Sequence, residues 1–364
     1  MGLLVAFLVF SVLVIVHEYG HYIVAVKNGI TVEEFAIGMG PLIWSYKKKD
    51  TLFSIRLLPL GGYCRMKGME PPEDEEEAQT GVVIERTDED SYQNKTVWQR
   101  ISVIFAGSFF NLLLLAIITL ILVSTNGFPS LTVASLSEGM PAAEAGIIPG
   151  DTLVSIDGRS MRIFQDAPRA LRNNGERPIE IVIDRNGEII SKTITPMLSN
   201  YNYLIGFAPL HYNGLFAGES YFPNANIFQI LHTSFWQSIH FSRVIVDALI
   251  DLFSGNLSFD DLGGPVRVIS DIGQVYEVSI EHSPWSAVTN ILTIAALLTA
   301  NLAIFNLLPV PPLDGGRLVF LFIEAIRGKP VSPEKEGLVH LIGIVLLVLL
   351  IIAVSFNDIL RLFN

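Results

Sequence analysis

Hydrophobic residues gather in four blocks along the 364-residue chain. Each block has about 18–25 residues, the length that an α-helix needs to cross the hydrocarbon core of a bilayer. The blocks are Met1–Val26, Ile101–Thr125, Ala287–Val310 and Leu338–Ser355. Between the second and third blocks the composition is that of a water-soluble domain. The pattern therefore predicts four membrane spans and one domain that is exposed to water.

The overall composition agrees with a membrane protein. Hydrophobic residues make up 50% of the chain, and the mean hydropathy of +0.47 is well above that of a typical soluble protein. The first block has no basic segment before it and no small-residue cleavage site, so we expect a retained span rather than a removable signal peptide. The net charge of −12 argues against a nucleic-acid-binding surface. The single cysteine, Cys64, excludes an internal disulfide.

Lysine and arginine residues near the span ends predict the orientation. The loops after the first and third spans are rich in these residues, whereas residues 126–145, just after the second span, contain none. We therefore expect both termini and the water-exposed domain outside, and the two basic loops in the cytoplasm. Much of the acidity lies in Glu70–Asp90, which we expect to form a solvated, partly disordered loop.

A short hairpin is expected after the first span. Leu42–Tyr46 and Leu52–Leu58 are apolar strand candidates, separated by the polar residues 47–51. Glycine and proline break the pattern at Gly38–Pro41 and turn the chain again at Pro59–Tyr63. Backbone N–H and C=O groups at membrane depth need hydrogen-bond partners from protein or water. We therefore expect this hairpin to fold against the spans, near a cavity.

Residues 127–196 have the pattern of a compact β-rich module. We expect strands at 132–136, 152–156, 179–184 and 188–195, and short helices at 141–145 and 164–171. Asn186-Gly187 is a strong hairpin signal. The string from Pro141 to Gly158 resembles a PDZ domain of the bacterial type. That resemblance implies binding of extended peptides by strand addition to a sheet edge. The alternative is a lid or spacer that binds no peptide.

These patterns divide the chain into four parts. They are an N-terminal membrane half with two spans (1–126), a PDZ-like domain (127–198), an amphipathic connecting region (199–286) and a C-terminal membrane half with two spans (287–364). Within the connecting region, Ile227–Phe253 has helix length but is too polar to span, so we expect it at the membrane interface. The predicted fold class is a polytopic α-helical membrane protein with about four transmembrane helices, a membrane-associated β-hairpin and an inserted extracytoplasmic PDZ-like α+β domain.

The first span contains the pattern His17-Glu18-Tyr19-Gly20-His21. On a helix, positions i and i+4 lie on one face, so both imidazoles can reach one metal ion. Glu18 lies beside them and can take a proton from a metal-bound water. Two histidines and a glutamate are costly in an apolar span, and ionisable groups there are functional candidates. The alternative is a set of polar groups that pair with one another for packing.

A catalytic zinc typically takes three protein ligands, so one more is needed. We expect Asp314, which follows three prolines at the cytoplasmic end of the third span. The prolines forbid a regular helix there and predict an extended segment. His17 and His21 lie toward the cytoplasmic end of the first span, so a shared site is geometrically plausible.

Taken together, these motifs resemble the site-2 protease family of intramembrane zinc metalloproteases, in particular the bacterial branch that cleaves anti-sigma factors and remnant signal peptides. The resemblance covers nearly the whole chain. Its motifs are the H-E-x-x-H of the first span, Gly38–Pro41, Pro59–Tyr63, Phe105-Ala106-Gly107 with Asn111, Gly263–Pro265 and Asn306–Gly316. Two departures are Ser108, where the family usually has proline, and a single PDZ-like module where some relatives have two.

The resemblance implies a role for individual residues. His17, His21 and Asp314 would bind one Zn²⁺ per chain, with Glu18 as the general base. Asn306 would help to hold the substrate backbone, and the Phe53–Leu58 strand, represented by Ile55, Arg56 and Leu57, would pair with an unwound substrate. The expected partners are single-span membrane proteins and membrane lipid, with no nucleic acid, in the bacterial cytoplasmic membrane.

Three other classes of protein share some of these features. A metal-transport protein can place histidine and aspartate in its spans, but it does not need Glu18 in this pattern. A membrane scaffold with a PDZ-like module does not need the metal residues. An inactive relative would usually have lost one of the four key residues, and here all four are present. The sequence therefore favours an active protease, with its physiological substrate open.

Overall fold

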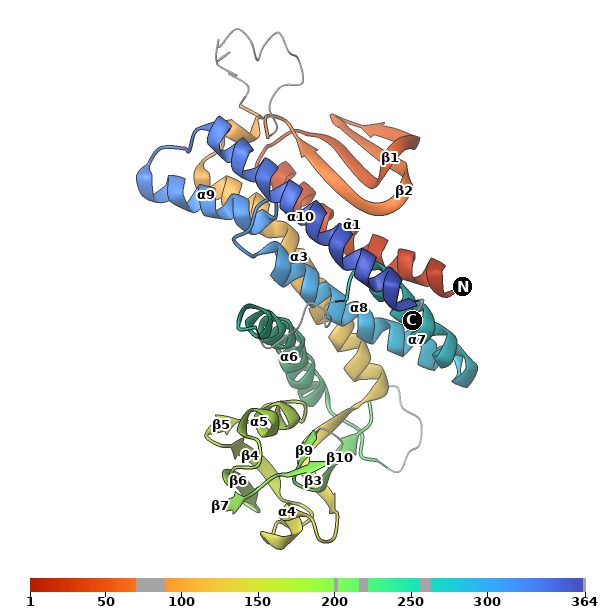
Figure 1. The fold of residues 1–364 in the computed structure, drawn as a ribbon, viewed down its shortest axis with the longest axis vertical. Helices are drawn as coiled ribbons and strands as arrows, with labels where there is room; N and C mark the ends of the chain where they lie inside the picture. The colour runs from red at the N-terminus through yellow and green to blue at the C-terminus, as the bar shows by residue number, and fades with distance from the viewer. Residues whose placement is uncertain (70–88, 200–201, 216–221, 256–262, 363–364) are drawn as a thin grey trace. The chain divides into compact units, whose positions relative to one another are not determined.

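The computed structural model describes residues 1–69, 89–199, 202–215, 222–255 and 263–362, in two compact units. One unit consists of residues 1–115 and 244–364, and the other of residues 116–243. The predicted acidic loop lies almost entirely outside the described residues. The first unit is mainly helical and carries the long apolar helices, whereas the second is rich in β-strands (Figure 1).

Four helices among the described residues are long and apolar enough to cross a membrane. They are α1 (Gly2–Lys27), α3 (Val97–Asn126), α8 (Pro284–Asn306) and α10 (Pro333–Leu362). Their positions confirm an apolar helix of spanning length at each of the four predicted blocks, although α8 ends at Asn306, before the predicted end of the third block. The prolines that follow cannot continue the helix.

Small residues let α1 and α3 approach each other closely. A Cβ atom added at Gly20 of α1 would lie 2.5 Å from the carbonyl oxygen of Ala106 on α3. Close backbone approach at small residues is a common way for helices to associate in membranes, where no hydrophobic driving force acts between them. This crossing lies next to His17 and His21, and therefore sets the distance between α3 and the predicted metal ligands.

A helix that the sequence did not predict, α7 (Pro265–His282), packs on α8 and on α1. Gly2 at the start of α1 abuts Gly273 of α7, where an added Cβ would lie 2.5 Å from the Gly273 Cα. At the beginning of α7, the buried Asp358 of α10 accepts hydrogen bonds from the backbone N–H groups of Gly264 and Arg267, at 3.2 and 3.0 Å. A carboxylate is well placed there because helix N-termini present unpaired N–H groups.

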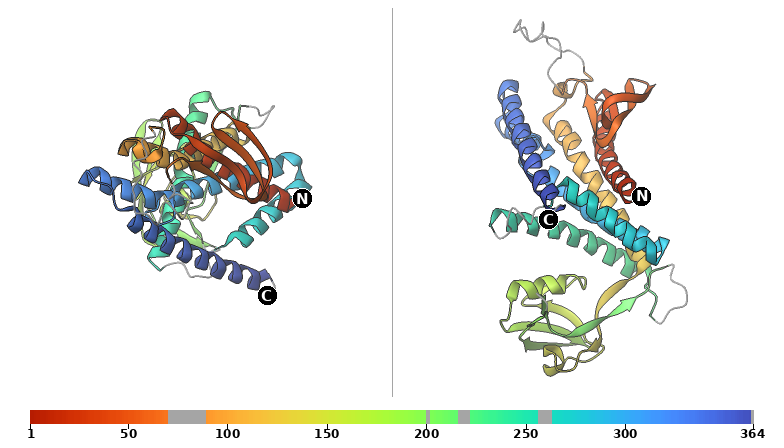
Figure 2. Two further views of the ribbon diagram at one scale, coloured as in Figure 1. Left: turned by 90° about the horizontal axis from the view of Figure 1, so that it is seen from above. Right: turned by 45° about the vertical axis from the view of Figure 1, so that its right-hand side comes forward.

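The segment after the first span forms two long strands, β1 (Val32–Lys48) and β2 (Thr51–Met66), beside α1 (Figures 1 and 2). The predicted strands were too short, because both glycine-rich segments continue in extended conformation. Residues 34–37 pair with residues 62–65 on one side and with residues 52–55 on the other. The strands therefore fold back, and the sheet has four segments in the order 61–66, 32–37, 51–58, 42–48. Gly38, Gly40 and Gly61 allow this bending with φ values of 86°, 83° and 80°.

The second unit contains a sheet in the order β10-β3-β4-β6-β7. The strands are β3 (Phe128–Leu136), β4 (Thr152–Ile156), β6 (Ile179–Arg185), β7 (Glu188–Ile194) and β10 (Phe207–Tyr212), with a short β5 (Arg159–Ser160) on β4 and a separate hairpin of β8 (Met197–Ser199) and β9 (Asn202–Leu204). Helices α4 (Pro141–Glu144) and α5 (Asp166–Asn174) complete it. The strands predicted between residues 132 and 195 are confirmed within a few residues. The sheet extends past residue 198, because β10 pairs with β3.

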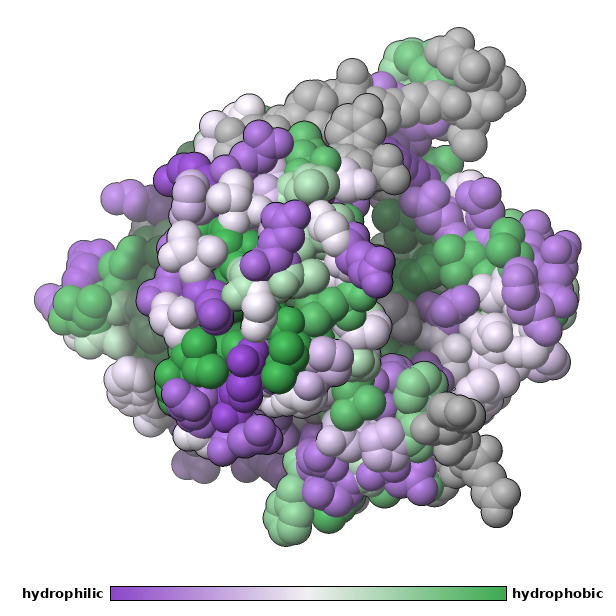
Figure 3. Space-filling view, turned by 90° about the horizontal axis from the view of Figure 1, so that it is seen from below, coloured by the Kyte–Doolittle hydropathy of each residue, from purple (hydrophilic) through white to green (hydrophobic). Residues whose placement is uncertain are grey.

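A closed apolar core holds this second unit together. Leu153, Ile156, Ile181 and Ile183 are among its fully buried members. On the face of this unit drawn in Figure 3, hydrophilic side chains are interspersed with hydrophobic ones. The helix α6 (Ile227–Phe253) follows the sheet and has the bounds that the sequence predicted. Ile230 of α6 packs with Val123 and Phe128 in a smaller cluster.

Candidate metal centre

His17 and His21 lie one turn apart on α1 and point in the same direction. Both side chains are buried, at 7% and 6% exposure. Their Nε2 atoms are 3.2 Å apart, and the two rings meet edge to face. The continuous helix explains this, because residues i and i+4 share a face.

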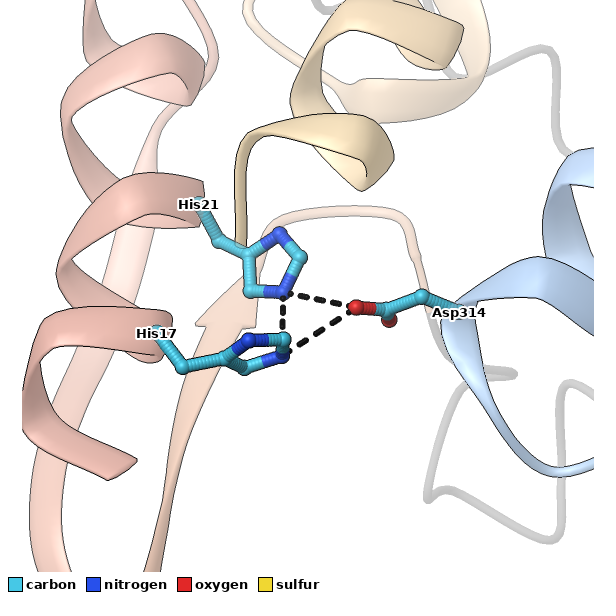
Figure 4. Close-up of side chains that lie close together, drawn as sticks. All are labelled: His17, His21 and Asp314. Atoms are coloured by element: carbon cyan, nitrogen blue, oxygen red, sulfur yellow. Dashed lines mark hydrogen bonds and ion pairs between the residues drawn. The ribbon is translucent and has the colours of Figure 1, made fainter. Parts of the chain in front are cut away.

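Asp314 reaches the same point from the other membrane half of the chain. The turn after α8 closes tightly and ends at Asp314, the first residue of α9 (Asp314–Arg327). A Cβ atom at Gly315 would lie 2.1 Å from the carbonyl oxygen of Leu308, so only glycine allows the turn to close this far. The Oδ2 atom of Asp314 is 3.2 Å from the Nε2 atoms of both His17 and His21 (Figure 4).

These three atoms have the spacing that a tetrahedral zinc ion requires. Ligand atoms bound at about 2.0–2.1 Å lie about 3.3 Å from one another, and the three observed separations are 3.2 Å. The Oδ2 atom of Asp314 is buried and has no hydrogen-bond partner among the described residues, as expected of a ligand atom. No other group of three potential metal ligands occurs in the described part of the chain. Two imidazoles and one carboxylate are a donor set that suits zinc.

The outer nitrogen of His21 is fixed by the backbone of α3. Its Nδ1 atom lies 2.8 Å from the carbonyl oxygen of Val103. A carbonyl can only accept, so Nδ1 carries the proton and Nε2 presents its lone pair to the metal position. Such hydrogen bonds orient metal-bound histidines and increase their basicity.

Asn111 contacts the outer nitrogen of His17, as Val103 contacts that of His21. The residue is fully buried, and its Nδ2 atom lies 3.2 Å from the Nδ1 atom of His17. Its Oδ1 atom is buried without a partner in the described residues. The two ends of an amide are interchangeable in shape. Turning the amide by half a turn brings Oδ1 of Asn111 next to Nδ1 of His17. The Nδ1–H group can then donate a hydrogen bond to Oδ1. Nε2 of His17 keeps its lone pair for the metal.

Gly107 provides the space in which the two imidazoles meet α3. A Cβ atom at this position would lie 2.4 Å from Nε2 of His21 and 2.7 Å from Cε1 of His17. Any larger residue would therefore compete with the imidazoles for the metal position. Gly107 and Asn111, four residues apart on α3, form one side of the site.

Glu18 lies between the metal ligands and the β1–β2 sheet. It is half-buried, and the backbone N–H of Cys64 is directed at its carboxylate. The strand approaches closely because residue 62 is glycine, whose added Cβ would lie 3.6 Å from Cγ of Glu18 and 2.8 Å from the carbonyl oxygen of Ala36. The segment 61–66 pairs with β1 on one side only. Among the described residues no further strand pairs with this segment, and its Gly62 lies beside Glu18.

The strand pairing places the predicted substrate-binding residues inside the sheet. Ile55 pairs with Ile37 on one side and Trp44 on the other, and Arg56 pairs with Leu42. This segment, which includes Leu57, is central in the sheet and has no free edge for a further strand at Ile55. Local sequence could not show this, because the pairing of residues 34–37 with 52–55 is set by the fold of the whole segment.

The Arg56 side chain is also engaged within the sheet. It donates hydrogen bonds to Glu34 at 2.7 Å and to the carbonyl oxygen of Gly40 at 2.9 Å. Burial alone would raise the pKa of Glu34, but hydrogen bonds from Ser54 and Arg56 outweigh it and lower that pKa. Arg56 therefore stabilises the bent strand.

Asn306, the other predicted substrate-binding residue, is the last residue of α8 and is half-buried. Its side chain forms no hydrogen bond with another described residue and remains available to a ligand. Sequence reasoning assigned no role to Val103, Gly107, Asn111 or the Cys64 N–H. The spacing of Gly107 and Asn111 on one helix face was the available signal.

Comparison with known proteins gives three results. Residues 5–350 match the profile described as peptidase family M50. The zinc metalloprotease RasP of Bacillus licheniformis is 33% identical over an alignment of 442 positions, which covers both chains completely. The regulator of sigma-W protease RasP of Bacillus subtilis is also 33% identical, over 98% of this chain and 97% of that protein.

Two more distant likenesses were found. A putative zinc metalloprotease of Clostridium acetobutylicum is 32% identical over 98% of this chain and 97% of its own length. The crystal structure of a PDZ domain from an SdrC-like protein of Listeria monocytogenes is 17% identical, with a TM-score of 0.21, and covers 23% of this chain and 90% of that domain. A structural likeness of this size carries no conclusion about binding.

Proposed function

Because the chain belongs to peptidase family M50, we propose that His17, His21 and Asp314 hold its zinc ion, one per chain, and that Glu18 is its general base. The protein is an intramembrane zinc metalloprotease that hydrolyses peptide bonds of membrane proteins. The observation that supports the residue assignment is the 3.2 Å triangle of two imidazole nitrogens and one carboxylate oxygen, built partly on a membrane-length helix.

The proton transfers of hydrolysis fall to Glu18. A bound zinc ion supplies polarisation of the scissile carbonyl and a more acidic water. The Glu18 carboxylate takes a proton from the attacking water as the carbon–oxygen bond forms. It then returns the proton to the amine nitrogen as the carbon–nitrogen bond breaks.

We assign substrate pairing to the edge segment 61–66 in place of residues 55–57. A transmembrane helix keeps its carbonyl groups in intrahelical hydrogen bonds, so a substrate must unwind before cleavage. Strand addition to a free edge replaces those bonds. Segment 61–66 has such an edge beside Glu18, and Asn306 provides a further amide for the substrate backbone.

A series of methylated substrates tests strand addition without altering the enzyme. Single N-methyl groups placed along the residues around the scissile bond remove one N–H each. In an added strand, only alternate N–H groups face the sheet edge. Cleavage should therefore fall at every second position. A uniform response along the series would contradict strand addition.

The substrates are proposed to be single-span membrane proteins, such as an anti-sigma factor or a remnant signal peptide. The regulator of sigma-W protease, 33% identical to this chain, supports this class. We further propose that the protein spans the bacterial cytoplasmic membrane several times with the β-rich unit outside, and that the unpaired edge of β10 takes up a peptide strand.

Zinc analysis of a ligand variant tests the central assignment. Asp314→Asn should fold, lose most of its zinc and lose cleavage of a single-span substrate, because an amide oxygen is a much weaker ligand than a carboxylate. The matched control is Asp271→Asn, which changes an exposed carboxylate on α7 and should keep both properties. Full zinc content in Asp314→Asn would show that Asp314 is not a zinc ligand.

A further inference from the structure

The exposed side chains of the β1–β2 sheet change in character along its length. At one end, where the strands bend, Met39, Leu42, Ile43, Leu57 and Leu58 are 50–61% exposed. At the other end, the last residues of β1 and the turn after them carry three consecutive lysines, residues 47–49, all of them exposed. The sheet is thus apolar at one end and cationic at the other.

Aromatic residues occupy the zone between these ends. Trp44 and Tyr46 project from the same face of β1, with 55% and 56% of their surface exposed. Their rings stack at 6.4 Å between centroids. Tryptophan and tyrosine gather where hydrocarbon meets headgroups, because their rings are apolar and their polar atoms need partners.

The register of the sheet shows how its apolar and cationic ends lie along the first span. Lys47 pairs with Leu52, and Leu52 pairs with Glu34, close to the point where the chain leaves α1 at Lys27. The pair of Met39 with Leu58 lies at the opposite end of the sheet. Gly62, on the neighbouring segment, lies beside Val14 in the middle of α1. The lysine turn is therefore level with the end of the span, and the apolar bends reach toward its middle.

On the membrane-associated sheet that the sequence predicts, we propose that Lys47, Lys48 and Lys49 bind the phosphates of anionic phospholipid headgroups. If the sheet were surrounded by water, the apolar side chains at the bends would form a large exposed apolar surface. Lipid covers that surface and also supplies the opposite charge, since none of the three lysines is ion-paired within the described residues. Basic residues at a membrane surface attract anionic lipid in this way. The proposal goes beyond peptide hydrolysis and does not depend on it.

Fluorescence quenching by brominated lipid tests whether lipid reaches Trp44 and whether anionic lipid gathers beside the three lysines. The full-length chain, with Trp98, Trp236 and Trp285 changed to phenylalanine, is placed in nanodiscs of four parts phosphatidylcholine and one part phosphatidylglycerol. In one preparation the phosphatidylglycerol is brominated, and in the other an equal amount of phosphatidylcholine. Trp44 should be quenched about twofold more strongly by the brominated anionic lipid.

Two matched triple variants identify the cause. Lys47, Lys48 and Lys49→Gln should remove the preference for the anionic lipid while quenching by both lipids persists. Arg327, Lys329 and Lys335→Gln removes the same charge from another exposed basic segment and should keep the preference. Three results would overturn the proposal: no quenching of Trp44, equal quenching by both lipids in the parent, or equal loss of preference in both triple variants.

Discussion

The two units of this protein differ most in the side chains that they leave exposed. The β-rich unit encloses apolar residues such as Ile156, Ile181 and Ile183, which are fully buried. The helical unit leaves many apolar residues exposed, with Leu346 at 61% and Leu349 at 57% on α10. Beside a buried apolar cluster that contains Val103 and Ile104, it also buries His17, His21 and Asn111.

The difference follows from the surrounding solvent. Water drives apolar side chains into a core, whereas lipid accepts them at the surface and makes unpaired polar groups costly. A polar group buried in the helical unit therefore needs a partner or a ligand. The metal centre is such a place, with Val103 and Asn111 pairing the outer histidine nitrogens. We therefore expect buried apolar side chains to matter most for the stability of the β-rich unit. In the helical unit, we expect exposed apolar side chains to matter little and the buried polar side chains to matter for the metal centre.

The largest effect is expected from filling the space beside the imidazoles. In Gly107→Ala, the new methyl group must displace His21, whose Nε2 atom lies 2.4 Å from the added Cβ. We expect a folded protein with little zinc and with cleavage reduced at least about 100-fold. Metal analysis of the purified variant beside wild type provides the measurement. Normal zinc content would show that α3 does not confine the site.

A pair of apolar truncations compares the two solvents directly. Ile181→Ala removes a fully buried side chain from the β-rich unit and should lower its stability by about 2–5 kcal/mol. Leu349→Ala removes an exposed side chain from α10 and should change stability by less than about 0.5 kcal/mol. Thermal unfolding of both variants in the same detergent gives the two values. Equal losses would contradict the assignment of α10 to lipid.

A smaller effect is expected from the partner of His17. Asn111→Leu removes the amide and should weaken zinc binding about 10–100-fold, because the histidine then has no partner for Nδ1–H. Asn111→Asp restores an acceptor and should recover most of the affinity. Competition with a chelator measures both without any substrate. If both variants bind zinc equally poorly, Asn111 acts through packing alone.

Sequence reasoning succeeded where the signal was local. The lengths of the apolar blocks predicted the four spans, and the bounds of α6 were predicted at Ile227 and Phe253. The i, i+4 spacing of His17 and His21 predicted that they share one face of the helix. Asn186-Gly187 indicated the turn between β6 and β7, where both residues have positive φ.

Pairings between distant segments could not be predicted in this way. The partners of residues 52–55 depend on the fold-back at Gly38 and Gly40, so the central position of Ile55 could not be read from its neighbours. The addition of β10 to the sheet is likewise a long-range pairing. Helix α7 was missed because its position depends on contacts with Gly2 and Asp358, far away in the chain.

The most direct test of the account compares wild type with Glu18→Gln in detergent, measuring zinc per chain and cleavage of a single-span substrate in the same preparations. Glutamine keeps the shape of the side chain but cannot carry the proton. We predict about one zinc in each protein, cleavage by wild type, and cleavage slowed at least about 100-fold in the variant. Cleavage by Glu18→Gln at the wild-type rate, or a well-folded wild type without zinc, would contradict the account.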